Sequence, residues 1–476
     1  MEAPAVLRYP LSMTTPIPEP AATAPAFELN GRRVELAGSD PTESLLRWLK
    51  RQRLHGTKEG CGDGDCGACT VAMIETDADG RSHYRAVNSC LLPMGSVVGR
   101  EILTVEALAD GEMLHPAQQA LVDHSGSQCG YCTPGFVMSL FAGGYGGELN
   151  DHTTEGNLCR CTGYAPIRRA TAELATLDFS ADRFAEGLRR ERQSAGEAML
   201  GHYFSPTTVE GALALKQQHP EAAWIAGATD LGVGLSRGQT VASSFIALDR
   251  IAELQQIQKT ANGWRIGAGV PLSRLESELG DAIPALGEML RWFAARQVRN
   301  RATLGGNLGS ASPIGDLSPL LLALDARIEL RGPGGMRQVA ADEFFTGYRQ
   351  TVMARDELIV VVEIPAGDST CMAYKVAKRQ SDDISIVAAV FAIGLDEGQS
   401  IRHARLAYGG VAATPLRARG VEEYLVGRRL DRATVETACA MLRAAFTPLS
   451  DHRAGADYRR ALCASLFDKF VAERFA

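Results

Sequence analysis

The cysteines are the residues of this chain whose spacing most clearly indicates chemistry. Eight of the eleven lie between Lys58 and Cys161. The first four combine a C-x4-C-x2-C run with one distant cysteine, the spacing of plant-type 2Fe–2S ligation; they are Cys61, Cys66, Cys69 and Cys90. The other four form a C-x2-C pair and a C-x-C pair; they are Cys129, Cys132, Cys159 and Cys161. We therefore predict two 2Fe–2S clusters.

Zinc sites and disulfides are the alternatives for such cysteines. Four-cysteine zinc sites usually combine two C-x2-C-like pairs, whereas the first set here has an x4/x2 spacing and the second ends in a tight C-x-C pair. Disulfides need an oxidising compartment, and no secretory signal is recognisable. Glycines interleave the first set and let backbone N–H groups turn toward an anionic cluster; they are Gly60, Gly62, Gly64 and Gly67. The other three cysteines have no paired spacing, and we expect no iron at Cys371, Cys439 and Cys463.

Length and composition indicate a multidomain globular protein. At 476 residues the chain is too long for one hydrophobic core, so we expect three or four domains. A net charge of −7 argues against nucleic acid as the main partner. No apolar run reaches the roughly 18 residues of a membrane span. Residues 1–25 are rich in Pro and Ala and predict a disordered lead. Reduced cysteines fit a cytoplasmic protein.

Residues 26–105 predict a ferredoxin-like domain around the first cysteine set. A hairpin with its turn at Asn30-Gly31, a helix, the glycine–cysteine loop and a strand over 70–74 follow the order of a β-grasp ferredoxin. The start of the helix is predicted from a cap, a first-turn proline and a capping-box acid; these are Asp40, Pro41 and Glu43.

Residues 106–181 predict an all-helical domain around the second cysteine set. Helices are expected to start at Pro116, at Thr133 and at Pro166. Cys132 and Cys161 would then precede helix N-termini, whose dipoles stabilise thiolate and cluster charge.

Residues 203–367 predict an α/β domain with Gly-rich turns, after a charged and polar linker over 182–202. Consecutive N–H groups in the loop 303–307 can form an anion nest for a diphosphate, with Gly305 or Gly306 at positive φ. No G-x-G-x-x-G follows a strand, so this is not the dinucleotide fingerprint. Beside two electron carriers, the turns indicate a flavin site.

Residues 368–476 predict an α+β closing domain, because strands come first and helices follow. The expected strands cover 358–364, 374–377, 385–395 and 401–408, and the expected helices 415–427 and 431–446.

The chain after residue 26 resembles the small subunit of two-chain bacterial xanthine dehydrogenases, in the molybdenum hydroxylase family. Four motifs carry the resemblance, namely Gly56–Cys69, Gly126–Gly135, Gly156–Tyr164 and Ala302–Asp316. It implies a multidomain α+β chain with a β-grasp 2Fe–2S ferredoxin domain and an all-α 2Fe–2S domain. A two-lobed α/β FAD domain of vanillyl-alcohol-oxidase type and a C-terminal flavoprotein domain would follow.

The resemblance also implies roles for single residues. The first cysteine set would hold the cluster nearer the flavin, and the second the cluster nearer the molybdenum cofactor, with Gln128 approaching its pterin. Tyr348 would support the nicotinamide, unless it is an ordinary core aromatic. Asp316 would accept from a cofactor hydroxyl and Lys375 would supply a cation, unless both are ordinary surface charges. The flavin contacts carried over are Trp224, Ile225, Ala226, Gly227, Ala228, Thr229, Asp230, Leu231, Phe293, Thr303, Leu304, Gly305, Gly306, Asn307, Asp316, Ile359 and Lys375.

The activity implied by the resemblance is electron relay in purine catabolism. Hypoxanthine and xanthine would be oxidised to urate at molybdopterin in a separate large subunit, within an α2β2 heterotetramer. Electrons would pass through both clusters to FAD and on to NAD. Two alternatives remain open: the electron-transfer chain of a related molybdenum hydroxylase acting on an aldehyde or N-heterocycle, and an iron–sulfur binding module without flavin.

Overall fold

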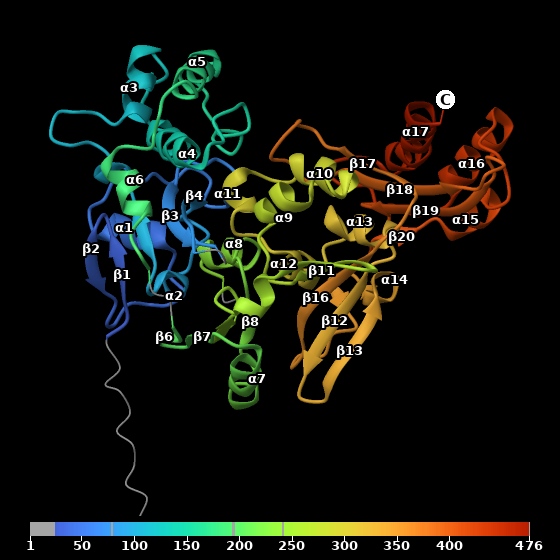
Figure 1. Cartoon of the computed structure of the whole chain (residues 1–476), viewed down its shortest axis with the longest axis horizontal. Helices are drawn as coiled ribbons and strands as arrows, with labels where there is room; N and C mark the ends of the chain where they lie inside the picture. Colours follow the sequence, from blue (N-terminus) through green and yellow to red (C-terminus); the bar gives the residue numbers. More distant parts are fainter. Residues whose placement is uncertain (1–23, 78–79, 193–195, 240–241, 476) are drawn as a thin grey trace, which may run out of the picture.

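The structure is a computed structural model that describes residues 24–77, 80–192, 196–239 and 242–475. Four units follow one another, and Figure 1 shows two small ones at the left, a central one, and a C-terminal one at the right. Strands and helices occur in one mixed arrangement, so the predicted multidomain α+β architecture is confirmed. Of the expected disordered lead, residues 1–23 lie outside the described part of the chain.

The ferredoxin-like domain is a five-stranded sheet in the order β2-β1-β5-β3-β4 with a helix packed on it. The hairpin turn uses left-handed backbone at Asn30 (φ 53°) and Gly31 (φ 76°), as the sequence predicted. Parallel pairing of β1 with β5 gives the β-grasp order. Its elements are β1 (Ala26–Leu29), β2 (Arg32–Glu35), α1 (Leu45–Arg51), β3 (Thr70–Thr76), β4 (Ser82–Asn88), α2 (Met94–Val97) and β5 (Glu101–Leu103).

Helix α1 starts later than predicted. Asp40 does not cap it, because its side chain instead accepts from the backbone N–H of Thr42 in a local turn. Ser44 is the N-cap and its hydroxyl accepts from Arg47 N. Glu43 pairs with Arg51 at the other end of the helix instead of closing a capping box.

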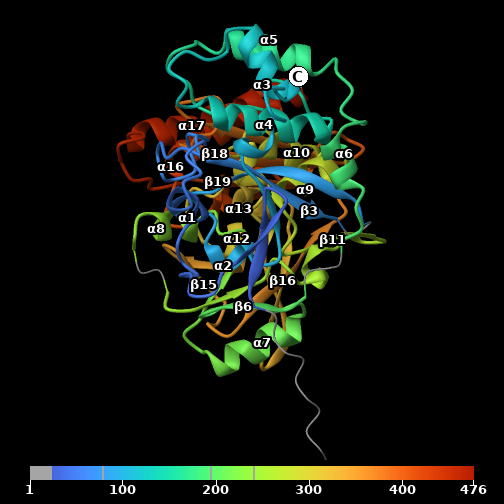
Figure 2. The ribbon, with the colours of Figure 1, turned by 90° about the vertical axis from the view of Figure 1, so that its left-hand side faces the viewer.

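The helical domain lies on β3 and β4 of the ferredoxin-like sheet, as Figure 2 shows from the side. Its main helix α4 is apolar around most of its girth because it is the core of this domain. The predicted helix starts are reproduced to within one residue. The helices are η1 (Val105–Ala107), α3 (Pro116–Asp123), α4 (Thr133–Gly146), α5 (Ala165–Leu174) and α6 (Arg183–Leu188).

The segment predicted as a linker over 182–202 contains regular structure. Helix α6 starts at the N-cap Asp182, and Phe184 is buried against Phe141 and Tyr84. The linker was predicted from the many charged residues of this segment, and its buried aromatic side chain, Phe184, was overlooked. The end of the same segment is a strand of the central domain; residues 193–195 lie outside the described ranges.

The central domain has two lobes. The first is a four-stranded sheet in the order β6-β7-β9-β8 with two helices; its elements are β6 (Ala198–Leu200), β7 (Tyr203–Ser205), α7 (Val209–Gln218), β8 (Ala223–Ile225), α8 (Leu231–Ser236) and β9 (Phe245–Ala247). The second is a five-stranded antiparallel sheet in the order β10-β11-β16-β12-β13; its strands are β10 (Ile257–Thr260), β11 (Gly263–Gly267), β12 (Arg327–Gly332), β13 (Gly335–Ala340) and β16 (Leu358–Pro365).

Short helices and one hairpin complete the second lobe and separate the two sheets. One of these helices, α12, contains most of the Gly-rich segment predicted to bind a diphosphate. They are η2 (Ala252–Gln255), α9 (Leu272–Leu279), α10 (Pro284–Arg291), α11 (Arg296–Arg299), α12 (Leu304–Gly309), α13 (Leu317–Ala323), α14 (Ala341–Phe344), β14 (Phe345–Gly347) and β15 (Gln350–Thr351).

The C-terminal domain is a four-stranded sheet covered by helices, with one helix more than the sequence analysis placed. Of the four strands expected here, the one over 358–364 belongs instead to the central domain, and the fourth strand of this sheet lies inside the expected helix 415–427. The added helix α17 buries Phe467 and Phe470 against the sheet. The elements are β17 (Thr370–Val376), β18 (Val387–Leu395), β19 (Ile401–Gly409), β20 (Leu416–Arg417), α15 (Arg419–Leu425), α16 (Arg432–Ala444) and α17 (Ala456–Arg474). Among the described residues, no helix is long and apolar enough to cross a membrane.

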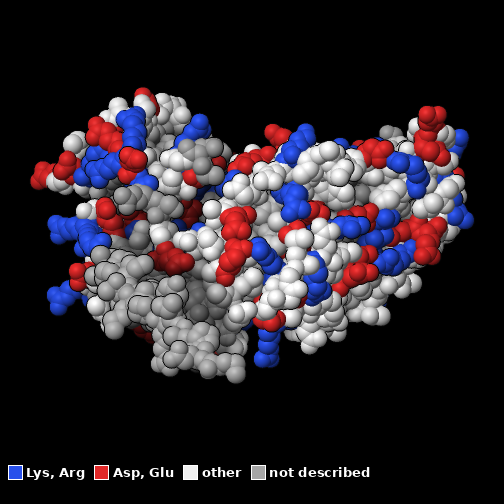
Figure 3. All heavy atoms as spheres, turned by 60° about the horizontal axis from the view of Figure 1, so that its bottom comes forward, with Lys and Arg blue, Asp and Glu red and all other residues white. Residues whose placement is uncertain are grey.

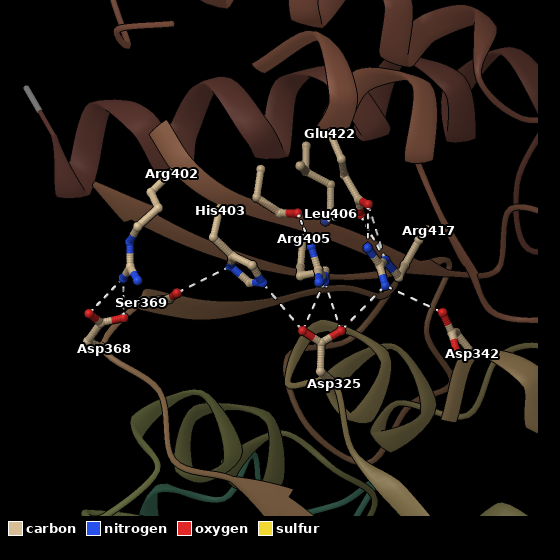
Figure 4. Close-up of polar contacts among 11 residues, drawn as sticks. Asp325, Asp342, Asp368, Ser369, Arg402, His403, Arg405, Leu406, Arg417 and Glu422 are labelled. Carbon is tan, nitrogen blue, oxygen red and sulfur yellow. Dashed lines mark hydrogen bonds and ion pairs between the residues drawn. The ribbon is translucent and has the colours of Figure 1, made fainter. Parts of the chain in front are cut away.

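An ion network joins the C-terminal domain to the central domain (Figure 4). Asp325, just after α13, accepts from Arg405 Nε at 2.8 Å and lies 3.3 Å from His403 Nε2. Arg417 lies 3.4 Å from Asp325 and bonds Glu422 at 2.6 Å. Burial alone would raise the pKa of Asp325, but its hydrogen bond with Arg405 and the nearby charges lower it.

Asp325→Asn should weaken the contact between these two domains. A carboxylate with a lowered pKa stabilises the fold above about pH 4 and loses that effect as the pH falls through its folded pKa. We expect a loss of about 1 kcal/mol or less at pH 7, because the group is partly exposed, and a smaller difference well below pH 4, at about pH 2.5, where the pH has fallen toward the lowered folded pKa. Thermal unfolding checks this, with Asp368→Asn, an exposed partner of Arg402, as the control. An equal difference at both pH values would contradict the assignment.

Candidate functional site

The first cysteine set lies on the loop between α1 and β3, with Cys90 just after β4. Each of the Cys61 and Cys66 sulfurs accepts from the backbone N–H of the other, at 3.4 and 3.2 Å. The Cys69 and Cys90 sulfurs are 3.3 Å apart. The adjacent Cys66 thiol lowers the pKa of Cys61 to about 5. Left-handed glycines make the turns that aim these amides, as expected; they are Gly62, Gly64 and Gly67.

The second cysteine set lies at the start of α4 and ahead of α5. Cys132 is the N-cap residue of α4, whereas Cys161 lies before the N-cap of α5, which is Tyr164. The Thr162 hydroxyl donates to Cys159 Sγ at 3.1 Å. Burial alone would raise the pKa of Cys159, but the hydrogen bonds from Thr162 lower it. The dipole argument from the sequence therefore applies by position to Cys132 alone, and there burial nevertheless raises the pKa of the thiol to about 12.

In both sets the sulfurs are arranged as two pairs. All eleven cysteines are free, and no three His, Cys, Asp or Glu side chains in the described ranges converge as a single metal ion requires. A 2Fe–2S cluster has two irons, so four thiolates in separated pairs fit it. The residues therefore fit a binuclear cluster better than a zinc ion or a disulfide. The pairs are Cys61 with Cys66, Cys69 with Cys90, Cys129 with Cys161, and Cys132 with Cys159.

A cavity of about 670 Å³ is lined by the ferredoxin-like, central and C-terminal domains. Its volume is in the range of sites that hold cofactors. Every residue predicted to contact flavin lines it except Leu304, which is buried in the core of the second lobe. The sequence analysis missed several lining residues that come from other domains; they include Asp63, Asp65, Leu91, Arg379 and Ser385.

The predicted diphosphate nest at 303–307 is wrong in this structure, because its amides already have partners. Gly305 N donates to Ala268 O at 2.7 Å and Gly306 N to Thr303 Oγ1 at 3.0 Å. These residues form the first turn of α12, and neither Gly305 nor Gly306 has positive φ. The segment looked like a free loop because glycine is a poor predictor of helix.

The free amides lie instead in the turn between β8 and α8. Ala228 has a left-handed backbone (φ 63°), which turns consecutive N–H groups to one side. A Cβ on Gly227 would lie 1.7 Å from Arg301 O, so only glycine fits there. This turn lines the cavity and fits a diphosphate. The amides that donate to no atom of the described chain are those of Gly227, Ala228, Thr229 and Asp230.

A buried ion pair closes one side of the cavity. Lys375 Nζ lies 2.9 Å from Asp316 Oδ2 and also donates to Trp292 O. Ser385 Oγ donates to the other oxygen of Asp316 at 2.5 Å. Asp316 and Lys375 therefore bind each other with buried side chains, which excludes the alternative that both are ordinary surface charges.

Several buried polar atoms on the cavity wall have no partner within the described chain. Such atoms normally find a hydrogen bond, so they indicate a missing ligand. Burial, with the nearby Asp65, raises the pKa of Asp382 to about 7. The unpaired atoms are Trp224 Nε1, Asn307 Oδ1 and Asp382 Oδ2. The cavity therefore fits a large polar cofactor such as FAD.

Two further predicted residues lie on the surface. Tyr348 is at the β14–β15 turn and is 65% exposed, which excludes the alternative that it is a core aromatic. Its neighbour Arg349 lines the cavity and lies 3.6 Å from Asp230. Gln128 is exposed beside the exposed Cys129.

Helix α8 joins the first cysteine set to the cavity. Arg237, at its end, bonds Asp63 of the cysteine loop with two hydrogen bonds of 3.0 and 2.6 Å. A Cβ on Gly232 would lie 2.3 Å from Leu91 O, so the helix touches the chain directly after Cys90. Leu91 itself lines the cavity. Sequence reasoning could have found Leu91 only from its position next to a ligand.

Four family models match consecutive parts of the chain. A 2Fe-2S iron-sulfur cluster binding domain matches residues 27–95, and a [2Fe-2S] binding domain matches 104–172. The FAD binding domain in molybdopterin dehydrogenase matches 195–367, and the CO dehydrogenase flavoprotein C-terminal domain matches 372–474. The chain therefore contains two 2Fe–2S binding domains and an FAD-binding domain.

Relatives agree with these matches. The xanthine dehydrogenase of Emericella nidulans is 32% identical over 93% of this chain and 38% of its own length. The solved carbon monoxide dehydrogenase of Hydrogenophaga pseudoflava has a TM-score of 0.54 and 30% identity, over 56% of this chain and 94% of that one. Quinoline 2-oxidoreductase of Pseudomonas putida 86 has a TM-score of 0.54 and 26% identity, over 59% and 98%.

The chain belongs to the molybdenum hydroxylase family. It forms the iron–sulfur and flavin part of that family's architecture. The chain spans about two fifths of the length of the curated relatives it matches, such as the 38% covered in the fungal protein.

Gly306→Val should lower the FAD content while leaving iron unchanged. Gly306 lines the cavity, and an added Cβ would lie 2.9 Å from Thr303 Oγ1, so a branched side chain crowds the space for the cofactor. Overpacking of about 1–3 kcal/mol corresponds to roughly five- to 150-fold in affinity. Flavin and iron per chain are measured, with Gly367→Val, which meets nothing within 4 Å, as control. Wild-type flavin content in the variant would contradict this placement.

Single serine substitutions should separate the two clusters. Cys66→Ser should abolish one paramagnetic signal of the reduced protein and keep the other, and Cys129→Ser should do the reverse, because the two sets lie in different domains. Cys439→Ser should keep all iron, since that thiol donates to Ala464 O inside the C-terminal domain. Loss of both signals from a folded single variant would disprove independent sites.

Proposed function

We propose that this chain is the electron-transfer subunit of a xanthine dehydrogenase. The observation that carries the proposal is the spatial order of its sites. Cys129 and Cys161 form an exposed pair, Cys132 and Cys159 lie behind them, and the first cysteine set leads on to the cavity. The second cysteine set, the first cysteine set and the cavity thus follow one another in space. This order suits a carrier that accepts electrons at the helical domain and releases them at the cavity.

The cofactors would supply the redox chemistry, and the chain positions them and excludes water. The cysteines named above would hold the two clusters. The amides of the β8–α8 turn would bind the FAD diphosphate, and the buried Asp316–Lys375 pair would fix the wall of the cavity. Leu91 would separate the first cluster from water on the side that faces the flavin. The same proposal places the protein in the cytoplasm, where thiols stay reduced.

The surface around the second cysteine set supports docking of a molybdenum-binding large subunit. Apolar and aromatic side chains there remain exposed, at 50% for Tyr131, 40% for Leu158 and 36% for Tyr164. Exposed apolar groups around a functional site indicate a partner surface. Gln128 would reach the pterin from this rim, and the complex would be an α2β2 heterotetramer. On the face of Figure 3, both charge signs interleave, which does not favour nucleic acid.

Hypoxanthine and xanthine are the proposed substrates of the complex, with urate as product and NAD as acceptor. The fungal relative is a xanthine dehydrogenase. A second candidate is a related hydroxylase of another substrate, because the solved relatives are a carbon monoxide dehydrogenase and a quinoline oxidoreductase. Co-purification with the partner, molybdenum analysis, and turnover of xanthine against an aldehyde and quinoline test the choice. Turnover of only a non-purine would overturn the proposal.

Tyr348→Ala should weaken NAD turnover and leave dye reduction intact. The exposed ring lies beside the cavity-lining Arg349 and would stack on the nicotinamide; losing it removes about 1 kcal/mol, roughly five- to tenfold in affinity. The ring is largely exposed, so we expect no change in melting temperature. Activities with NAD and with an artificial dye are compared, with Tyr458→Ala, also exposed, as control. Equal loss of both activities would refute the nicotinamide role.

A further inference from the structure

The two cysteine-bearing loops touch each other directly between the two cluster sites. Leu158, next to Cys159, donates its backbone N–H to Cys66 O at 3.0 Å. The side chain of Asn157 donates from Nδ2 to Gly67 O, also at 3.0 Å. The contact therefore joins the segment before one proposed ligand to the segment that contains another.

Glycines let the loops approach closely at this contact. A Cβ on Gly67 would lie 2.2 Å from Gly156 O, and a Cβ on Gly135 would lie 2.2 Å from Gly67 O. Either would collide with backbone, which cannot move aside. The spacing of the two loops is thus set by backbone contact at three glycines.

Asn157 is held in one orientation by groups from three domains. Its Oδ1 accepts from Ser139 Oγ at 2.7 Å and from Gln297 Nε2 at 3.1 Å, and Ser139 and Gln297 belong to the helical and central domains. Its Nδ2 points to Gly67 O of the ferredoxin-like domain. Asn157 is 2% and Gln297 1% exposed, so water does not compete for these bonds.

We propose that Asn157 is a positioning residue for electron transfer between the two clusters. It holds Leu158 N–H on Cys66 O, so covalent bonds and one hydrogen bond connect Cys159 to Cys66 without a gap. Electronic coupling falls steeply across gaps, so this contact sets the transfer rate. One electron leaves the second cluster and reduces the first, and no bond or proton changes. The proposal rests on the proposed relay function.

The test compares Asn157→Leu with Asn88→Leu in the full chain. Asn88 is a matched control because its buried Nδ2 donates to Gly64 O of the same cysteine loop, at 3.2 Å, and contacts Cys69 Sγ at 3.7 Å, so it touches the first cluster site without crossing domains. The chain is reduced with dithionite, and the splitting of the paramagnetic signals by interaction between the two clusters is recorded. We expect Asn157→Leu to keep both signals and lose most of the splitting, while Asn88→Leu keeps the splitting.

A kinetic measurement follows in the complex with the large subunit. Asn157→Leu should slow substrate-driven flavin reduction at least tenfold with KM unchanged, whereas reduction of the flavin by NADH stays at the wild-type rate. Unchanged splitting and rate would overturn the proposal. The splitting needs neither partner nor substrate, so its result is independent of whether the relay function itself is correct.

A second variant covers the case in which leucine disturbs folding. Asn157→Asp keeps the shape and the acceptor oxygen but removes the N–H donor to Gly67 O. We expect it to retain both signals with reduced splitting. Loss of the second cluster in both variants would also overturn the proposal, because Asn157 would then be required for cluster binding and not for spacing.

Discussion

Buried charges between the domains are the constraint on which the rest of the structure depends. Arg299 is fully buried and bridges Glu155 of the helical domain and Glu276 of α9. Arg301 is buried with Glu75 of the ferredoxin-like domain and Asp249. Removing one partner of such a pair leaves an uncompensated charge and costs about 3–5 kcal/mol. The domains therefore dock in one arrangement or lose much of their stability.

Both arginines belong to one short segment of the central domain, α11 and the residues that follow it. Between them Asn300 donates to Ala86 O of β4 at 2.9 Å. Gln297 donates to Asn157 at the contact between the two cysteine-bearing loops. Burial alone would raise the pKa of Asp249, but Arg100 and Arg301 lower it to about 2, so it stays charged in this network. The backbone of Arg301 also packs on Gly227 of the β8–α8 turn. The segment 296–301 thus contacts both cysteine-bearing domains and the turn that lines the flavin cavity.

Local patterns predicted most of the elements and the cysteine sets, because spacing and turn chemistry are local properties. The Asn30-Gly31 hairpin and the prolines at helix starts are examples. The start of α1 was missed because Asp40 and Ser44 can both cap a helix. The choice between them depends on local contacts, since Asp40 accepts from Thr42 N in its own turn and Ser44 accepts from Arg47 N. The diphosphate site was placed at the wrong glycines, since the amides of 304–307 donate to the turn that follows β11 and to the N-cap of α12; the acceptors are Val270, Ala268 and Thr303. Leu91 could be found only from its position next to Cys90, and the importance of both Leu91 and Asn157 depends on contacts between domains that no local pattern predicts.

The position of α11 in the sequence has a consequence for biogenesis. It is synthesised after both cysteine-bearing domains, yet it supplies the positive charges that neutralise Glu75 and Glu155. Until α11 docks, these two carboxylates lack their positive partners and must stay hydrated. The two cysteine-bearing domains therefore remain exposed to water where they later contact α11. Cys69, Cys90 and Cys159 are buried in the full chain. Docking of the central domain therefore completes the charge balance beside the cysteine-bearing loops, so we expect these two domains to reach their final packing only after α11 has folded against them.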